Sequence, residues 1–227
     1  MFHPGILGLF INPYYFARKG LAIHIRELGS HMTGKTLDIG CGTKPYEKLC
    51  RSSQYIGLEL DSKENRATKS ADFFYDGHRI PFEDLHFDSV MVNQVLEHVF
   101  HPKELLIEIR RILKPGGKLL ISVPFVWNEH EEPRDFARYS SYGLKYLLRN
   151  QGFEIMESRK SVNDIRVIFQ LFNLFLNQKM KTADGRLNLL LRILFLSPMN
   201  ILGELLAKIT PRCENLYLDN ILLARKL

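Results

Sequence analysis

The sequence is poor in the features that define several large classes of protein. Its 227 residues include three cysteines, at positions 41, 50 and 213, which follow no CxxC spacing and form no even framework. A zinc site or a secreted disulfide scaffold is therefore not expected, and a reducing cytoplasm fits best. No run of eighteen uncharged apolar residues occurs, so a membrane-spanning helix is not expected either.

Signals for nucleic-acid binding and for secretion are also missing. Lys and Arg number 31 against 25 Asp and Glu, a formal net charge of +6, yet no run of five or more basic residues occurs. The modest bias favours acidic partners in general, and nucleic acid is not expected among them. The apolar opening MFHPGILGLFINPYYFARKG lacks a basic leader and a small-residue cleavage site, so it is not expected to be a signal peptide.

The glycine turn in TLDIGCGTKPYEKL matches neither of two common phosphate-binding loops. It lacks the GK[ST] of a Walker loop, and Pro45 stands where a dinucleotide turn has its third glycine. Gly40 and Gly42 still expose backbone amides, whereas Asp38 would repel a pyrophosphate and favour a ligand carrying ammonium and sulfonium charges. Glu59 stands about where a carboxylate accepts hydrogen bonds from both hydroxyls of a ribose.

Strand and helix patterns alternate along the chain. Strands are expected at 35–40, 54–61, 70–76, 87–93, 118–125, 153–160 and 215–226. Helical spacing covers 17–29, Pro102 to Leu113, and Ser140 or Ser141 to Leu148, and KPGG at 114–117 predicts a helix stop followed by a turn. This alternation predicts an α/β fold with a mostly parallel sheet covered on both faces.

Length and apolar content, 45%, fit one domain over 1–227 with two additions. Residues 1–30 are expected to form an N-terminal helical cap. Residues 163–212, rich in Leu, Ile and Phe, are expected to form a helical insertion between the last two strands. Two interpretations of this insertion stay open: core packing or a homodimer face, and a lid or surface in peripheral contact with a membrane.

Taken in this order, the motifs resemble those of class I S-adenosylmethionine-dependent methyltransferases of the type 11-like group. The resemblance covers roughly residues 17–160. It is carried by DIGCGT, by YIGLELD, and by the stretches YDGHRIPFEDLHFDSVMVNQVLEHV and ELLIEIRRILKPGGKLLISVPF. It implies a Rossmann-like three-layer sandwich with a seven-stranded, mostly parallel sheet, an antiparallel last strand, and S-adenosyl-L-methionine as cofactor.

The resemblance also implies which residues hold the cofactor. These are Asp38, Gly40, Cys41 and Gly42 at the methionine part, Glu59 at the ribose, Leu60, Asp76 and Gly77 at the adenine, and Asn93 and Gln94 toward the substrate. The structural alternative is that they are ordinary turn residues and solvated strand ends. Lys44 departs from the pattern, since many members carry glycine there, and a side chain at this position can point to solvent.

Two histidines are candidates for a general base, which a hydroxyl acceptor would require. His98 lies in LEH after the fourth strand, and His130 lies in NEHEEPRDFARYS after the fifth. The second stretch resembles a pattern, HE-x-P-x-D-F-x-R-Y, seen in a subset of these enzymes associated with cell-surface glycan pathways. Substrate contacts are expected from Tyr15, Glu97, Asp135, Arg138 and Tyr139. The alternative is that Asp135 pairs with Arg138 and that Tyr139 docks the next helix.

The sequence therefore predicts a methyltransferase acting on a small-molecule or lipid-linked acceptor, with O-methylation of a sugar-like hydroxyl preferred. C-methylation of a quinone-type ring is the first alternative. A non-catalytic protein that binds S-adenosylmethionine and serves in assembly is the second. No metal is expected, and the location is expected to be cytoplasmic or membrane-peripheral.

Overall fold

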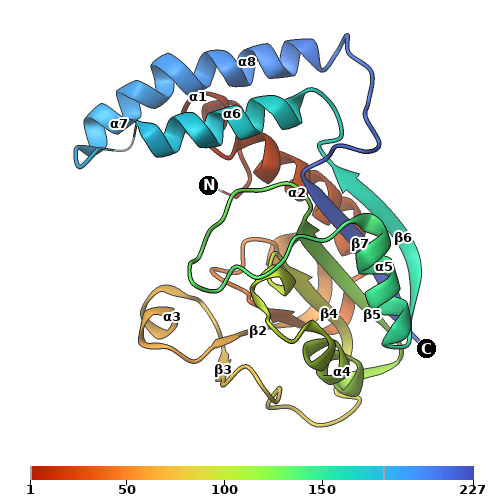
Figure 1. Ribbon diagram of the computed structural model, residues 1–227. Helices are drawn as coiled ribbons and strands as arrows, with labels where there is room; N and C mark the ends of the chain where they lie inside the picture. The colour runs from red at the N-terminus through yellow and green to blue at the C-terminus, as the bar shows by residue number, and fades with distance from the viewer. Residues whose placement is uncertain (1, 181) are drawn as a thin grey trace. The chain divides into compact units, whose positions relative to one another are not determined.

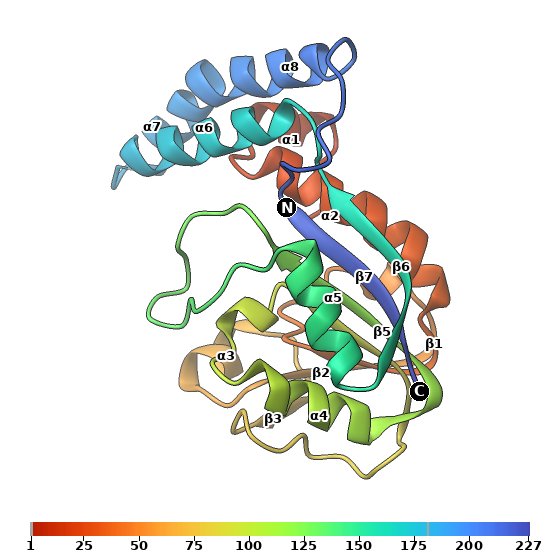
Figure 2. The ribbon, with the colours of Figure 1, turned by 45° about the vertical axis from the view of Figure 1, so that its right-hand side comes forward.

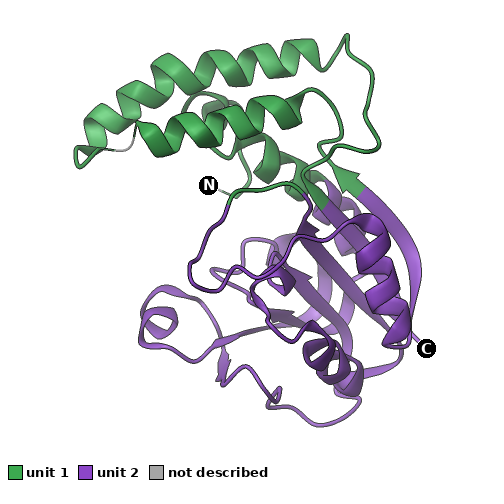
Figure 3. Cartoon of the chain, in the orientation of Figure 1, with its two compact units in different colours: residues 1–23, 126–128, 160–219 green, residues 24–125, 129–159, 220–227 purple. Residues whose placement is uncertain are grey.

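The structure, a computed structural model, describes residues 2–180 and 182–227 and forms two compact units (Figure 3). The first contains the N-terminal segment up to Ile23, residues 126–128 and residues 160–219. The second contains residues 24–125, 129–159 and 220–227. The chain therefore passes between the two units five times: within the second helix, at both ends of residues 126–128, within the sixth strand and at the start of the seventh.

The second unit is built on one seven-stranded sheet (Figure 1). The strand order is β3-β2-β1-β4-β5-β7-β6, with six parallel strands and β7 antiparallel, so the predicted fold class is confirmed. The strands are β1 Thr33–Ile39, β2 Arg51–Leu60, β3 Phe73–Tyr75, β4 Phe87–Asn93, β5 Leu113–Pro124, β6 Phe153–Ser161 and β7 Asp219–Lys226.

Helices cover the sheet on both faces (Figures 1 and 2). α4 (Pro102–Ile112) and α5 (Ser141–Asn150) lie on one face, and the part of α2 (Tyr15–Leu28) that belongs to this unit, residues 24–28, lies on the other. α3 (Lys63–Thr68) and the 3-10 turns Gly29–His31, Glu47–Leu49 and Leu96–His98 complete the connections. α5 begins where its sequence predicts, because the Ser140 hydroxyl accepts from the Gly143 N–H at 3.2 Å and caps the first turn.

The main core lies between the sheet and the α4–α5 layer. Alternate residues of the central strands, such as Leu37, Val90 and Leu119, face this layer and are fully buried. α4 contributes a stripe at helical spacing, since Leu105, Leu106, Ile109 and Ile112 are all buried against the same cluster. The predicted helix from Pro102 thus exists because its apolar face has a sheet to cover.

The structure corrects three sequence predictions of strand and turn positions. β3 has only three residues, Phe73–Tyr75, and pairs with β2 alone as an edge strand, whereas seven residues were expected. β7 begins at Asp219, four residues later than expected. KPGG ends the helix as predicted but forms a bulge inside β5: the register passes from Phe87 opposite Leu113 to Ser89 opposite Lys118, and Gly116 takes a φ of +73°.

The first unit is a group of helices: α1 (Ile6–Ile11), the start of α2, α6 (Arg166–Lys179), α7 (Gly185–Leu191), a π-helical stretch (Arg192–Leu196) and α8 (Ser197–Leu206). Its small core includes Phe16, Val167 and Leu218. Buried polar side chains join the helices. Gln170 accepts from the Phe16 N–H at 3.1 Å and donates to the Pro13 carbonyl at 2.8 Å. The Asn173 amide donates to Asn200 at 2.8 Å.

One helix in the described part of the chain, Gly185–Leu206, is long and apolar enough to cross a membrane by length and composition. The sequence analysis did not expect a membrane-spanning helix, and this finding rests on length and composition alone. The prediction looked for a run without charges, whereas single charges at Arg186, Arg192 and Glu204 interrupt this 22-residue helix without ending it.

Adjacent residues of α4 test the packing of the main core. Leu106 is fully buried and Ile107 is exposed. We expect Leu106→Ala to lower the free energy of unfolding by about 2–5 kcal/mol, because it removes buried methyl groups and leaves a cavity. Ile107→Ala should change it by about 0.5 kcal/mol or less. Urea denaturation of the two variants, followed by circular dichroism, checks this, and equal effects would contradict the assigned face of α4.

Candidate active site

The predicted cofactor residues meet at one edge of the sheet. β1, β2, β3 and β4 are parallel neighbours, so their carboxyl ends lie at the same edge. Asp38, Glu59 and Asn93 lie at these strand ends, and Asp76 directly follows β3. The strand order reverses direction between β1 and β4, which is where ligands bind in open α/β sheets.

The turn after β1 is held against the end of β2. The Gly42 N–H donates to Glu59 Oε1 at 2.7 Å, and the Gly40 N–H donates to the Leu58 carbonyl at 2.9 Å. Gly40 and Gly42 have φ of +69° and +55°, a region that side chains disfavour. A Cβ at Gly40 would collide with Val95, whereas a Cβ at Gly42 would meet nothing within 4 Å. Gly42 therefore presents backbone to open space, as a ligand-binding turn requires.

Asp38 is a buried carboxyl beside this turn. The Tyr55 hydroxyl donates to Asp38 Oδ2 at 2.7 Å. Burial raises the pKa of Asp38 to about 7; the Tyr55 hydrogen bond opposes this shift, and the negative charge of Glu59 adds to it. A cationic ligand at this edge would favour the ionised form, so Asp38 and Glu59 together fit a sulfonium cofactor.

Lys44 does not point to solvent, so the sequence interpretation of this position is corrected. Its φ is +53°, and its ammonium pairs with Asp72 while the side chain stays only 14% exposed. Asp72 also accepts from the Gly57 N–H at 2.7 Å. This ion pair offsets the unfavourable backbone conformation, which explains how a lysine occupies a position that favours glycine.

The remaining cofactor candidates are arranged around the turn. Cys41 is buried, and burial raises the pKa of its thiol to about 12, so it contributes packing and backbone instead of a thiolate. Leu60 ends β2 and lies where a Cβ on Gly77 would touch it at 3.0 Å. Asp76 is exposed and accepts from the His78 N–H at 2.9 Å, which fixes its own loop.

Asn93 and Gln94 share a partner on β5. The Ser122 hydroxyl donates to Asn93 Oδ1 at 2.5 Å and accepts from the Gln94 side chain at 3.2 Å. Gln94 has a φ of +55°, so the chain turns sharply directly after β4. These contacts hold both side chains at the edge of the sheet.

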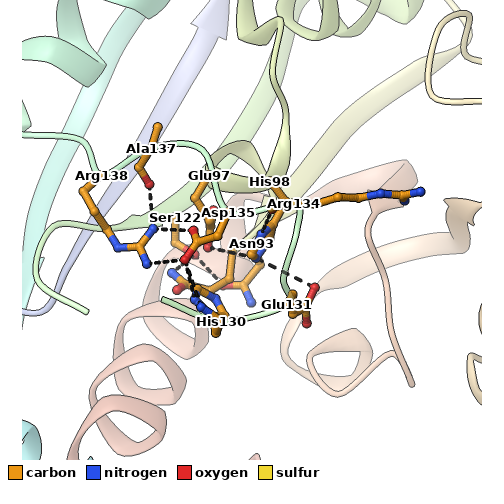
Figure 4. A network of polar contacts seen from close by, with 11 residues as sticks. Asn93, Glu97, His98, Ser122, His130, Glu131, Arg134, Asp135, Ala137 and Arg138 are labelled. Carbon is orange, nitrogen blue, oxygen red and sulfur yellow. Dashed lines mark hydrogen bonds and ion pairs between the residues drawn. The ribbon is translucent and has the colours of Figure 1, made fainter. Parts of the chain in front are cut away.

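The two candidate histidines lie next to each other (Figure 4). The rings of His98 and His130 are nearly perpendicular, with centroids 4.7 Å apart. His98 Nδ1 lies 2.6 Å from the Arg134 carbonyl oxygen, so that nitrogen carries the proton and Nε2 can accept one. His130 Nδ1 lies 3.4 Å from the Asp135 carboxylate. Both imidazoles are therefore oriented through their Nδ1 atoms.

Asp135 is the centre of this polar loop. Arg138 donates to its two oxygens at 2.6 and 2.7 Å, and the His130 N–H donates to it at 2.9 Å. The Arg138 guanidinium holds the pKa of Asp135 well below its usual range. The Asp135–Arg138 pair, the structural alternative considered in the sequence analysis, is therefore present. Tyr139 packs against the main core, and its carbonyl accepts from Asn220 at 2.7 Å.

Glu97 completes the cluster and is buried beneath the histidines. Its backbone carbonyl accepts from the Phe136 N–H at 2.9 Å and so ties the polar loop to the turn after β4. Within the described residues, Glu97, His98 and His130 are the group whose donor atoms, all within 4.8 Å of one another, could hold a metal ion. Nε2 of His98 lies 3.9 Å from Glu97, which is within ion-pair distance but longer than a hydrogen bond.

Sequence reasoning missed several residues that support the site. Tyr55, Asp72 and Ser122 each bond to a predicted residue or to the cofactor turn. Strand alternation could have identified Tyr55, because it shares a sheet face with Glu59 four residues later. Tyr15, predicted to contact substrate, belongs to the other unit, where it is buried and its hydroxyl accepts from Lys19 at 3.2 Å.

Comparisons with known proteins agree with this architecture. Residues 37–121 match the family model of a methyltransferase domain. The chain is 28% identical over 161 residues to the O-methyltransferase cnsE of Penicillium expansum, covering 60% of this chain and 58% of that one. It is 43% identical over 73 residues to the ubiquinone/menaquinone biosynthesis C-methyltransferase UbiE of Cupriavidus necator, covering 32% of this chain and 28% of that one.

A solved structure extends the likeness over nearly the whole chain. A SAM dependent methyltransferase from Archaeoglobus fulgidus has a TM-score of 0.59 at 17% identity, covering 98% of this chain and 100% of that one. The family model and the fold support a class I S-adenosylmethionine-dependent methyltransferase with S-adenosylmethionine as its cofactor. The chain spans 28% and 58% of the two named relatives, so their acceptors do not transfer to it directly.

Cofactor binding should depend on pH through Asp38. Its pKa is raised to about 7, so below pH 7 the carboxyl is protonated and must lose a proton before it can attract the sulfonium. We expect S-adenosylmethionine to bind about tenfold more weakly at pH 6 than at pH 8. Asp38→Asn should bind weakly at both values. Isothermal titration calorimetry checks this, and a wild-type affinity that does not change with pH would contradict the role of Asp38.

Proposed function

We propose that this methyltransferase transfers the methyl group to a hydroxyl of a sugar-like acceptor, either a small molecule or a lipid-linked one. The observation that carries the proposal is the oriented histidine pair at the carboxyl edge of the sheet, His98 and His130. A hydroxyl must lose its proton as it attacks, whereas a free amine already offers a lone pair. A positioned pair of bases therefore favours an oxygen acceptor.

His130 is the proposed general base, and Asp135 is its positioning residue. Asp135 holds the backbone N–H of His130 and lies beside its Nδ1, and Nε2 is the atom proposed to accept the proton of the acceptor hydroxyl. The bound cofactor supplies a methyl group already activated by positive sulfur. Asp38, Glu59, Asn93 and Gln94 would hold the cofactor as it gives up that methyl group to the acceptor oxygen and leaves with the electron pair of the carbon–sulfur bond. The remaining task of the protein is to align the acceptor and exclude water.

The polar loop has the composition of a sugar site. Glu131, Glu132 and Arg134 are exposed on the same loop as His130, and such side chains can bond to several hydroxyls at once. The 28% identity to a protein named as an O-methyltransferase supports oxygen as the atom that is methylated. Residues Asp38, Glu59, Asn93 and Gln94 are the proposed cofactor contacts.

C-methylation of a quinone-type ring is the second candidate. The observation that favours it is the segment of 73 residues with 43% identity to UbiE. The two candidates differ in product, since only the O-methyl product carries label on oxygen. A third candidate, a non-catalytic protein, would bind the cofactor without transferring label.

The experiment follows methyl-labelled S-adenosylmethionine into extract fractions. We expect label in a glycan or glycolipid fraction, with the methyl on oxygen by mass spectrometry. Label on a ring carbon of a quinone would favour the second candidate. Cofactor binding by calorimetry without label in the lipid, glycan, protein or RNA fractions would favour the third.

His130→Asn tests the base. We expect kcat to fall by about 10²–10³-fold with cofactor affinity unchanged, because general bases contribute about 10²–10⁴-fold. His101→Asn is the matched control, since His101 is an exposed histidine outside the cluster and should leave kcat unchanged. Steady-state kinetics at saturating cofactor gives both values. Activity of His130→Asn within tenfold of wild type would exclude the assignment, and loss of wild-type activity on chelation would assign the cluster to a metal ion instead.

A further inference from the structure

The helices of the first unit have an inverted distribution of polarity. α6 and α8 bury polar or small residues, among them Gln170, Asn173, Asn200 and Gly203. Large apolar side chains are exposed on α6, α7, the π-helical stretch and α8. We name six of these the apolar patch: Phe172, Phe175, Leu190, Leu194, Leu202 and Leu205, all exposed. Water-soluble helices normally show the opposite arrangement.

The apolar patch is too extensive to be ordinary surface. Of the apolar window within Gly185–Leu206, only 22% is buried. Soluble monomers rarely expose contiguous apolar surface on this scale, and such surface marks contact with a membrane or another protein.

The shape of the exposed surface favours lipid over a second copy of the chain. Exposed apolar side chains follow one another closely along this helix, since Leu189, Leu190, Leu194 and Phe195 are all exposed. A partner protein covers a limited part of a helix surface, whereas a bilayer can receive a broad apolar side. The close approach at Gly203, where a Cβ would lie 2.7 Å from the Phe16 ring, is the small-residue contact typical of helices packed within lipid.

The charges favour an anionic bilayer. Residues 163–212 contain seven basic and three acidic residues. Two of the acidic residues are engaged within the unit: Asp164 pairs with Arg166 at 2.6 Å, and Glu204 pairs with Lys19 at 2.6 Å. Arg186, Lys208 and Arg212 are exposed around the patch, where they can meet lipid phosphates.

The same charges argue that the helices lie in the interface and do not cross the bilayer. α6 has 14 residues, about 21 Å of helix, which is shorter than the hydrocarbon core. The longer helix, Gly185–Leu206, contains three charged residues, Arg186, Arg192 and Glu204. The end of α6 carries Lys179, and the following helix begins with Asp184 and Arg186, so the connection is polar. A helix lying in the plane with its apolar side immersed satisfies both observations.

We propose that the apolar patch docks the protein on the surface of an anionic lipid bilayer as a peripheral membrane protein. This goes beyond methyl transfer and does not depend on which acceptor is used. It gives the lipid-linked class of acceptor a physical reason, since docking would concentrate the protein where such acceptors reside.

The experiment is flotation of the full-length protein with vesicles of phosphatidylcholine alone or with one third phosphatidylglycerol. We expect most of the wild type to float with the anionic vesicles and far less with the neutral ones. Leu190→Glu combined with Leu194→Glu should reduce flotation at least tenfold. Ile107→Glu is the matched control, because Ile107 is 54% exposed against 56% for Leu194 but lies on α4, and it should float as wild type does.

Removing the cations tests the charge component separately. Arg186→Gln with Lys208→Gln should weaken binding to anionic vesicles by about fivefold for each cation and leave binding to neutral vesicles unchanged. S-adenosylmethionine affinity, measured by calorimetry, should be unchanged in every variant and reports that the protein is folded. It also separates failure of docking from failure of the methyltransferase assignment.

Three results would overturn the proposal. One is wild-type protein that stays at the bottom of the gradient with both vesicles. Another is flotation that Leu190→Glu with Leu194→Glu does not reduce. The third is a dimer by light scattering that the same double variant dissociates without any flotation of the wild type, which would make the patch an interface between two copies.

Discussion

The hydrogen bond from the Gly42 N–H to Glu59 Oε1, 2.7 Å long, links the turn after β1 to the end of β2. It requires the parallel register that places Asp38 opposite Gly57, because this register brings the carboxyl ends of β1 and β2 side by side. It also requires Gly42 to keep a left-handed backbone, which costs a side chain about 1 kcal/mol or more. The cofactor site therefore follows from pairing geometry before any ligand contact is considered.

The proposed catalytic half depends on a different link. His98 and His130 are separated by 32 positions in sequence, and they meet because β4 and β5 are parallel neighbours whose carboxyl ends lead into adjacent loops. The loop after β5 is held at this edge by its backbone contact to Glu97 and by the contact of His98 with the Arg134 carbonyl. The Asp135–Arg138 pair then sets the position of His130. One ion pair that a sequence reader would call structural thus also orients the proposed base.

Two kinds of sequence pattern, apolar periodicity and the order of motifs, were sufficient to predict most of the fold. Strand and helix periodicity located the central strands β1, β2 and β4 and the helix α4, because each buries a regular apolar face. Order and spacing of motifs identified the glycine turn and Glu59. Side-chain pairs between distant segments could not be predicted in this way: the contact of Tyr55 with Asp38 and the return of Lys44 to Asp72 depend on strand register, which composition does not specify.

The insertion shows why an apolar pattern alone does not distinguish core from surface. Periodicity predicts that one face of a helix is buried, but it does not say which face when polar residues can satisfy one another. Gln170 accepts from the backbone of Phe16 and Ala17, two donors in the first turn of α2 that no residue of that helix can satisfy. Asn173 and Asn200 bond to each other, and Asn200 also donates to the Leu9 carbonyl at 2.9 Å.

These polar contacts specify how the helices assemble in a way that apolar contacts cannot. If lipid covers the outer faces, apolar side chains gain little by leaving lipid for protein, so they do not choose one packing over another. A buried hydrogen bond favours one packing arrangement, because a buried amide without a hydrogen-bond partner costs about 1–3 kcal/mol. An inverted helix group is therefore the arrangement expected of a unit that must keep its shape while its outer surface rests in a bilayer.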